Sequence, residues 1–364
     1  MMSSSDAGER SETRVHRLEA EAFIRAARGK RILDVRTPGE FAKGHLPGAS
    51  NLPLFSDAER AEIGTLYKQV GREQAILRGL EIVGPKMEQL VRAAHIDVAD
   101  PAVYVHCWRG GMRSESLAWL LGLSGARAHV LIGGYKAFRN FALKKFAQPL
   151  RLIILGGRTG SGKTGILHAL QRLGEQIIDL EELALHKGSV FGGLHSGQPI
   201  TQQTFENALA VALEELDPSR PVWVEDESQR IGRVRIPDDF WRQMAHAPAV
   251  VVEMPVVLRK QIILADYGDI DRDQLSEAVQ RIEKHLGGLR TRQVIEAIAC
   301  GNLDKACDLL IPYYDKRYDY ALQRRHEEDI LSVRCETCVA EDNAAKILQA
   351  AEALLNGMTT PPLS

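Results

Sequence analysis

The sequence predicts an α/β protein with two domains, each built on a mainly parallel β-sheet, and a helical C-terminal part. The chain of 364 residues is long enough for about two domains of ordinary size. Short apolar runs alternate with stretches of helical character, which is typical of layered α/β folds. A glycine-rich turn directly follows one of these apolar runs near the middle of the chain, where the second domain is expected to begin.

The first domain is expected over residues 14–147, after a polar and disordered tail at residues 1–13. Pro149 ends a basic and aromatic segment and places the domain boundary there. Buried strands are expected where short apolar runs are bounded by charged or turn residues, at Arg31–Val35, Pro101–His106 and His129–Ile132. Two helices are expected between these strands, at Lys86–Ala94 and Ser114–Leu121.

The second domain is expected over residues 148–355, before a short polar tail at residues 356–364. Four apolar runs predict its strands, at Arg151–Leu155, Gln176–Asp179, Pro221–Glu225 and Ala249–Glu253. Gly165–Leu173 is expected to be helical. After about Val256 the chain is expected to be mostly helical up to the tail.

The composition narrows the classes of protein to consider. Apolar residues make up 45% of the chain and charged residues 26%, which is typical of soluble globular proteins. We expect neither a membrane span nor a secretory signal, since no apolar run is long enough. The five thinly spread cysteines argue against a secreted disulfide framework and favour the cytoplasm. With a formal net charge of −2, any nucleic-acid partner would need a local basic surface.

Residues 157–164 match the phosphate-binding P-loop pattern G-x-x-x-x-G-K-S/T in full. The backbone of such a loop surrounds a diphosphate with N–H groups, while Lys163 adds a cation and Thr164 a hydroxyl for magnesium. The residues expected to bind the diphosphate are Gly157, Gly160, Ser161, Gly162, Lys163 and Thr164. Glu225 and Asp226, at the end of a later predicted strand, are candidates to bind magnesium or the diphosphate, the alternative being a solvated acidic strand end.

A second motif, His106-Cys107-Trp108-Arg109-Gly110-Gly111-Met112-Arg113-Ser114, joins a predicted strand to a predicted helix. The helix dipole together with Arg109 and Arg113 would lower the pKa of Cys107 and favour the nucleophilic thiolate. The alternative is an inert buried cysteine. Five residues separate Cys107 from Arg113, as in cysteine phosphatases. This spacing predicts a loop wide enough for a tetrahedral oxyanion.

Several stretches resemble known families. Leu33–Phe41, Gly44–Ala49 and Asn51–Pro53, with Cys107, resemble the rhodanese signature over roughly residues 14–145. The order HCWRGGMRS, GGRTGSGKT, VEDESQRIG closely resembles the bacterial tRNA 2-selenouridine synthase family over roughly residues 14–350. The fold class is therefore expected to be a rhodanese-like parallel-sheet domain followed by a P-loop NTPase-like α/β domain.

The second resemblance implies a transferase that acts on 2-thiouridine at the wobble position of tRNA, in the lysine, glutamate and glutamine tRNAs. Members geranylate the sulfur with geranyl diphosphate and then exchange it for selenium from selenophosphate, which selenophosphate synthetase supplies. It implies no tightly bound cofactor besides these co-substrates and a candidate Mg²⁺. Cys107 either carries selenium as a perselenide or attacks the base, and Arg109 and Arg113 would neutralise the phosphate.

An RNA substrate requires a basic and aromatic surface. Candidates for tRNA contact are Trp108, Lys144, Lys145, Arg317, Arg324 and Arg325, and solvated surface cations are the alternative. Arg230 is a candidate for the diphosphate or the tRNA. Cys335 and Cys338 form a single CxxC pair, which is too few ligands for a structural zinc site.

Other functions fit parts of this pattern. The main alternative is a rhodanese-type sulfurtransferase fused to an ATPase or kinase. A cysteine phosphatase fused to a small-molecule kinase would also need a general acid, which no motif supplies. A non-catalytic tRNA-binding protein is disfavoured because both motifs are intact.

Overall fold

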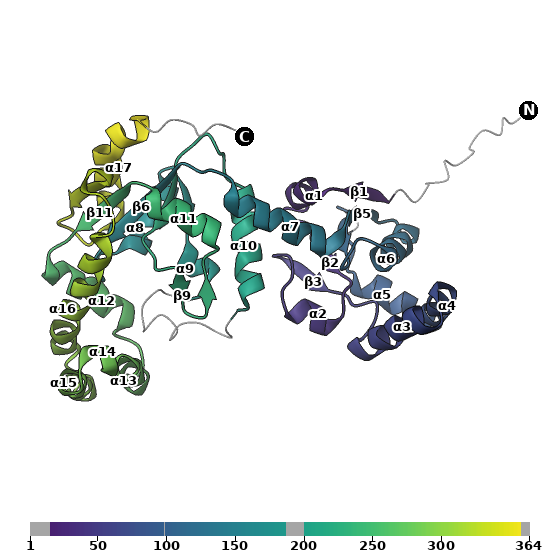
Figure 1. The fold of residues 1–364 in the computed structure, drawn as a ribbon, viewed down its shortest axis with the longest axis horizontal. Helices are drawn as coiled ribbons and strands as arrows, with labels where there is room; N and C mark the ends of the chain where they lie inside the picture. Colours follow the sequence, from purple (N-terminus) through teal and green to yellow (C-terminus); the bar gives the residue numbers. More distant parts are fainter. Residues whose placement is uncertain (1–14, 98, 187–199, 358–364) are drawn as a thin grey trace, which may run out of the picture. The chain divides into compact units, whose positions relative to one another are not determined.

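The computed structural model describes residues 15–97, 99–186 and 200–357 (Figure 1). These residues form two compact units. The first unit extends to Lys145 and includes Glu206–Glu214, whereas the second comprises Phe146–Phe205 and the chain from Glu215 onward. No helix of the described residues is long and apolar enough to cross a membrane.

The sheet of the first unit has five parallel strands in the order β1-β5-β4-β2-β3. The strands are β1 His16–Leu18, β2 Arg31–Asp34, β3 Ala49–Asn51, β4 Ala102–His106 and β5 Arg127–Leu131. The three predicted strands correspond to β2, β4 and β5. The two outer strands, β1 and β3, were not predicted because each is a three-residue segment without a fully buried side chain.

Among the described residues, seven α-helices accompany this sheet: α1 Ala20–Ala26, α2 Pro38–Ala42, α3 Asp57–Gln69, α4 Arg72–Val83, α5 Met87–Ala93, α6 Met112–Leu123 and α7 Gly134–Ala147. Capping boxes at Thr37 and Ser56 begin α2 and α3, because each hydroxyl accepts from the backbone three residues later and a glutamate reaches back. Helices α3 and α4 lie side by side (Figure 1).

The first unit also contains the end of α10 (Gln202–Glu214), although this helix follows the P-loop in the sequence. The Asn207 side chain donates to the Tyr135 hydroxyl over 2.8 Å and to the His45 carbonyl over 2.7 Å. Glu214 forms an ion pair with Lys145 at 2.6 Å. Residues Glu206–Glu214 therefore supply hydrogen-bond and ion-pair partners to the rest of the first unit.

The sheet of the second unit also has five parallel strands, in the order β12-β11-β6-β8-β7. They are β6 Leu152–Gly157, β7 Gln176–Ile178, β8 Val222–Glu225, β11 Ala249–Glu253 and β12 Ile330–Arg334, and a small hairpin consists of β9 Arg230–Ile231 and β10 Val234–Arg235. The four predicted strands correspond to β6, β7, β8 and β11. Strand β12 interrupts the C-terminal part that was predicted to be mostly helical. As an edge strand with only Val333 fully buried, β12 has a weak sequence signal.

The helices of the second unit are α8 Lys163–Arg172, α9 Leu180–Leu183, the start of α10, α11 Asp238–His246, α12 Val256–Tyr267, α13 Arg272–Arg281, α14 Glu283–Leu286, α15 Gly288–Ala299, α16 Leu303–Leu322 and α17 Ala340–Gly357. Helices α13, α14 and α15 gather next to α12 and α16 at one end of this unit (Figure 1). Helices α13 to α16 share an apolar core of their own, separate from the core under the sheet.

Candidate active sites

Cys107 begins the loop between β4 and α6, and its side chain is buried. The loop turns at Gly110, which has a left-handed φ of 64°. A Cβ atom at Gly110 would lie 2.6 Å from the carbonyl oxygen of Leu131, so only glycine fits there. The backbone N–H of Tyr135 donates to the Cys107 carbonyl over 2.8 Å. The cysteine is therefore held between the end of β4 and the start of α7.

Hydrogen-bond donors surround the Cys107 sulfur. The Gly111 N–H and the Ser114 hydroxyl each donate to Sγ over 3.3 Å. Burial opposes ionisation of the thiol, but the hydrogen bonds from Ser114, Gly111 and the Arg109 N–H outweigh it and lower the pKa of Cys107. Such an environment favours a nucleophilic thiolate.

Ser114 is a site residue that the sequence analysis did not single out. Its hydroxyl is buried in the first turn of α6, beside the sulfur. The available signal was its place in the cysteine motif, because the side chain of a residue in the first turn of a helix can reach back to the preceding loop. The lowered pKa of Cys107 therefore depends on this hydroxyl and on backbone N–H groups, whereas the prediction had named the helix dipole and the charges of the two arginines.

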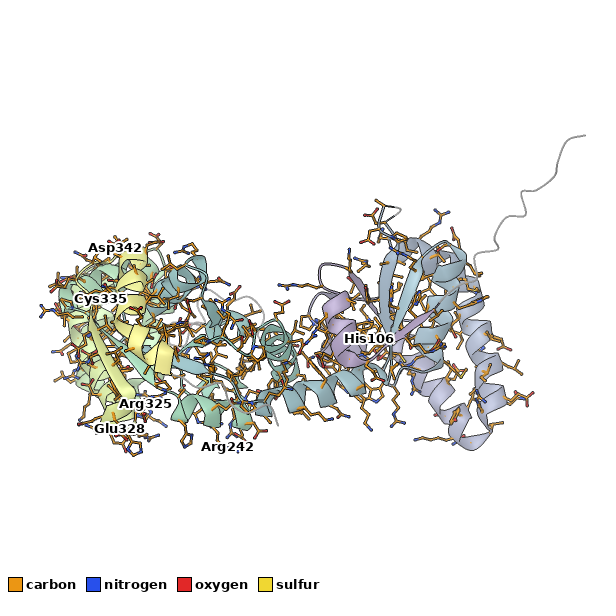
Figure 2. The ribbon with its side chains drawn as sticks, turned by 90° about the horizontal axis from the view of Figure 1, so that it is seen from above. His106, Arg242, Arg325, Glu328, Cys335 and Asp342 are labelled. Carbon is orange, nitrogen blue, oxygen red and sulfur yellow. The ribbon has the colours of Figure 1, made fainter. Side chains whose placement is uncertain are left out.

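A buried ion pair between Arg36 and Asp34 lies next to the cysteine loop. Arg36 donates to Asp34 over 2.6 Å, and both side chains are almost completely buried. The Arg36 guanidinium also lies 3.8 Å from the centre of the Tyr135 ring. His106, which is labelled in Figure 2, lies 3.7 Å from Asp34. Burial lowers the pKa of His106 to about 4, so this imidazole is neutral near pH 7. Arg36 thus links Asp34 to Tyr135, whose backbone N–H donates to the Cys107 carbonyl.

The two loop arginines differ in their surroundings. Arg113 donates to Glu40 over 2.8 Å, which neutralises much of its charge. Arg109 is exposed and has no acidic partner among the described residues. Trp108 is 38% exposed, with its ring centre 5.8 Å from that of Tyr135. Of the two arginines, only Arg109 offers an unneutralised cation to an incoming anion.

The P-loop links β6 to α8, as predicted. Gly157, Gly160 and Gly162 have left-handed φ values of 150°, 81° and 72°, which let the backbone turn its N–H groups toward one anion. The Lys163 ammonium donates to the Gly157 carbonyl over 3.1 Å, across the loop. The Ser161 hydroxyl is buried and has no hydrogen-bond partner among the described residues. An unpaired buried hydroxyl costs about 1–3 kcal/mol, which a ligand oxygen can offset.

Three carboxylates meet where β7 and β8 end, and we call Glu181, Glu225 and Glu227 the acid cluster. Their carboxylate oxygens lie within 4.8 Å of one another. Burial raises the pKa of Glu225 to about 7, against the opposing charge of Lys163, and burial also raises the pKa of Glu227 well above its usual range. One oxygen of buried Glu225 has no hydrogen-bond partner among the described residues. Carboxylates in this arrangement, close to the Thr164 hydroxyl, suit Mg²⁺.

Only one of the two acids predicted for this site belongs to the acid cluster. Asp226 instead accepts a hydrogen bond from Arg325 over 3.4 Å. Arg325, which is labelled in Figure 2, was predicted to contact tRNA. Its side chain also donates to the carbonyls of Ala247 and Met244 over 2.7 and 3.2 Å. The guanidinium of Arg325 therefore forms these contacts within the second unit. Glu181 was not predicted, although acids at the carboxyl ends of adjacent parallel strands are expected to meet.

The other predicted contacts with phosphate or tRNA lie on several elements. Lys144 is exposed on α7, whereas the neighbouring Lys145 is paired with Glu214. Arg317 and Arg324 are exposed on α16 and just beyond it, next to the rings of Tyr313 and Tyr320, respectively. Arg230 is exposed on β9. Lys144, Arg230, Arg317 and Arg324 thus remain accessible to an anionic partner.

A buried low-pKa cysteine on one parallel sheet and a P-loop on another define a rhodanese-like domain joined to a P-loop domain. The family models agree with this class. The model for the rhodanese-like domain matches residues 18–141, and the model described as "tRNA 2-selenouridine synthase AAA domain" matches residues 150–346.

Curated relatives extend the match over most of the chain. The protein of Shewanella denitrificans is 37% identical over 344 residues, covering 85% of this chain and 92% of the relative. Those of Shewanella loihica and Hahella chejuensis are 37% and 38% identical, covering 84% and 82% of this chain and 90% and 87% of the relatives. All three are named tRNA 2-selenouridine synthase. The chain belongs to the tRNA 2-selenouridine synthase family.

Proposed function

We propose that this protein converts 2-thiouridine in tRNA to 2-selenouridine by two reactions, geranylation of the sulfur and exchange of the geranylated sulfur for selenium. The observation that carries this proposal is the presence, in one chain, of a cysteine with a lowered pKa and of a loop suited to a diphosphate. The names of the relatives support tRNA as the substrate. Wobble 2-thiouridine of the lysine, glutamate and glutamine tRNAs is the proposed target.

In the first reaction, the sulfur of 2-thiouridine attacks the carbon of geranyl diphosphate that bears the diphosphate. A carbon–sulfur bond forms, the carbon–oxygen bond breaks, pyrophosphate leaves with the electron pair, and the base loses its N3 proton. Lys163 and the N–H groups of the P-loop would stabilise the charge of the leaving pyrophosphate. Alkylation prepares the next reaction, because an alkylated sulfur departs as a thiol.

In the second reaction, Cys107 as a thiolate attacks C2 of the base and the geranyl thiol leaves with a proton. The selenium of selenophosphate then attacks C2 and displaces Cys107, and water breaks the selenium–phosphorus bond to give phosphate. No atom changes its oxidation state along this route. A perselenide on Cys107 would require two electrons to pass from selenium to phosphorus, so attack on the base is the route we propose.

Two further groups have proposed roles. Arg109, the loop arginine without an acidic partner among the described residues, would hold the phosphate of selenophosphate beside Cys107. The acid cluster and Thr164 would hold Mg²⁺, which neutralises charge on a leaving pyrophosphate. Selenophosphate synthetase is the proposed source of the selenium donor. Lys144, Arg317 and Arg324 are the proposed phosphate contacts of the tRNA.

Mass spectrometry of nucleosides from 2-thiouridine tRNA, incubated with the protein, geranyl diphosphate and selenophosphate, tests the proposal. We expect 2-selenouridine from the wild type, accumulated geranylated thiouridine from Cys107→Ala, and neither product from Lys163→Ala. Cys300→Ala, at an exposed cysteine, is the matched control and should behave as the wild type. Absence of any modified base from the wild type, combined with ATP hydrolysis, would instead favour a sulfurtransferase–ATPase.

A further inference from the structure

An apolar pocket lies between α12, α13, α15 and α16 in the second unit. Its volume is about 80 Å³, several times the roughly 10–15 Å³ that one water molecule requires. None of the described residues that line it carries a charged side chain. Its walls are mainly aliphatic and aromatic, with contributions from Ile263, Tyr267, Leu275, Ile298, Leu310 and Tyr314.

The walls of this pocket are continuous with the P-loop. Thr159 lines the pocket, and a Cβ atom at Gly160 would lie 2.7 Å from the side chain of Ile263. Helix α12 is also tied to the loop, because Arg259 donates to the Thr159 carbonyl over 2.9 Å. The same arginine pairs with Asp315 of α16 at 2.5 Å and is almost completely buried. The diphosphate loop and the apolar pocket therefore form one connected structure.

We infer that this pocket holds part of the hydrocarbon chain of a prenyl diphosphate whose diphosphate lies in the P-loop, since a cavity of about 80 Å³ admits only a few carbons. The inference rests on the proposed function and specifies where its co-substrate binds. An apolar cavity stays dry and takes apolar ligands. Each CH₂ group that leaves water for such a cavity strengthens binding about fourfold. The pocket thus supplies the affinity and the chain-length preference, and the P-loop supplies the reacting end.

The lining distinguishes an isoprenoid from a nucleoside on the same diphosphate. A nucleoside carries ring nitrogens and ribose hydroxyls, and each loses affinity if it is buried without a hydrogen bond. Among the described residues that line the pocket, the polar side chains are those of Thr159, Tyr267, Cys307 and Tyr314. Burial raises the pKa of Cys307 to about 11, so this thiol stays neutral and behaves as an apolar group. A hydrocarbon chain has no polar group that needs a hydrogen-bond partner, so this lining suits it.

Calorimetric titration of the full chain with prenyl diphosphates of three chain lengths, and with inorganic pyrophosphate, tests the inference. Ala306→Phe places a ring in the pocket and should weaken geranyl diphosphate about 50-fold by excluding about three carbons. Dimethylallyl diphosphate should lose less affinity, and pyrophosphate should be unaffected. Ala321→Phe, at an exposed position on the same helix, is the matched control and should bind all four ligands as the wild type does.

The complementary variant is Leu310→Ala, which enlarges the pocket and should improve farnesyl diphosphate about tenfold. It decides the question even if Ala306→Phe fails to fold. If Leu310→Ala shows the same preference among chain lengths as the wild type, the hydrocarbon chain binds elsewhere. If the wild type also binds geranyl diphosphate and Lys163→Ala abolishes that binding, the proposed function still stands. A wild type that binds ATP but no prenyl diphosphate would overturn both.

Discussion

Replacing Ser114 by alanine tests whether hydrogen bonding lowers the pKa of Cys107. The hydroxyl lies 3.3 Å from the sulfur and 3.0 Å from the Gly111 carbonyl. It has one proton, so it can donate to the carbonyl while Cys107 is a thiol and turn to the sulfur when the thiolate forms. Ser114→Ala is therefore expected to destabilise the thiolate form of Cys107 more than the thiol form.

The magnitude follows from these two contacts. A hydrogen bond to a charged group contributes about 1.5–3 kcal/mol, and one to a neutral carbonyl about 1 kcal/mol. The difference, about 1–2 kcal/mol, raises the pKa of Cys107 by about one in Ser114→Ala. The N–H of Gly111 still donates to the sulfur, so part of the lowering should remain.

The rate of Cys107 alkylation by iodoacetamide, measured against pH, reports this change. Cys300 and Cys338 are exposed and would also react, so both are replaced by serine in every sample. Ser114→Thr keeps the hydroxyl and is expected to titrate as the parent protein does. A midpoint that is the same in Ser114→Ala and in the parent would show that the hydroxyl does not stabilise the thiolate.

Further predictions concern the acid cluster and the buried ion pair. The free energy of unfolding should fall by about 3 kcal/mol as pH rises from 4.5 to about 7, because Glu225 stays protonated in the folded state over that range. Urea titrations should show a smaller fall for Glu225→Gln. Mg²⁺ should bind more tightly above pH 7 than below it, since it competes with that proton, and calorimetry should find weaker binding to Glu225→Gln, with the remaining pH dependence coming from Glu227. Arg36→Met leaves Asp34 buried without its partner and should cost about 3–5 kcal/mol. Arg17→Met, at the exposed pair with Glu115, should cost less than about 1 kcal/mol, and urea titrations measure both variants.

Features contained in one continuous stretch of chain were predictable from the sequence. The P-loop and the cysteine loop each consist of a strand, a turn and the start of a helix, so the motif itself specifies the local geometry. The α/β class was confirmed for the same reason, because the apolar runs became the central strands of both sheets and the edge strand β7. Short edge strands such as β1 and β12 were missed, because their partly exposed residues lack an apolar run.

Features assembled from distant segments were harder to predict. Glu181 and Glu225 meet only because β7 and β8 are neighbours in the sheet, which the sequence order of these strands does not reveal. The partners of charged residues were equally hidden. Arg325 and Lys145 lie in basic stretches that suggest RNA binding, yet they form ion pairs with Asp226 and Glu214, respectively. A count of cations in a segment therefore overestimates the positive surface that remains for an RNA.

The end of α10 shows how far the support of the cysteine site extends along the chain. Asn207 holds the hydroxyl of Tyr135, whose ring carries the Arg36 guanidinium, and Arg36 in turn holds Asp34 beside His106 and Cys107. The family models divide the chain between residues 141 and 150, so they assign Asn207 to the P-loop part. A rhodanese-like fragment cut at that division would leave the buried hydroxyl of Tyr135 without its Asn207 partner. The cysteine site therefore depends on a helix that follows the P-loop in the sequence. The boundary between the two family matches does not separate two independent structural units.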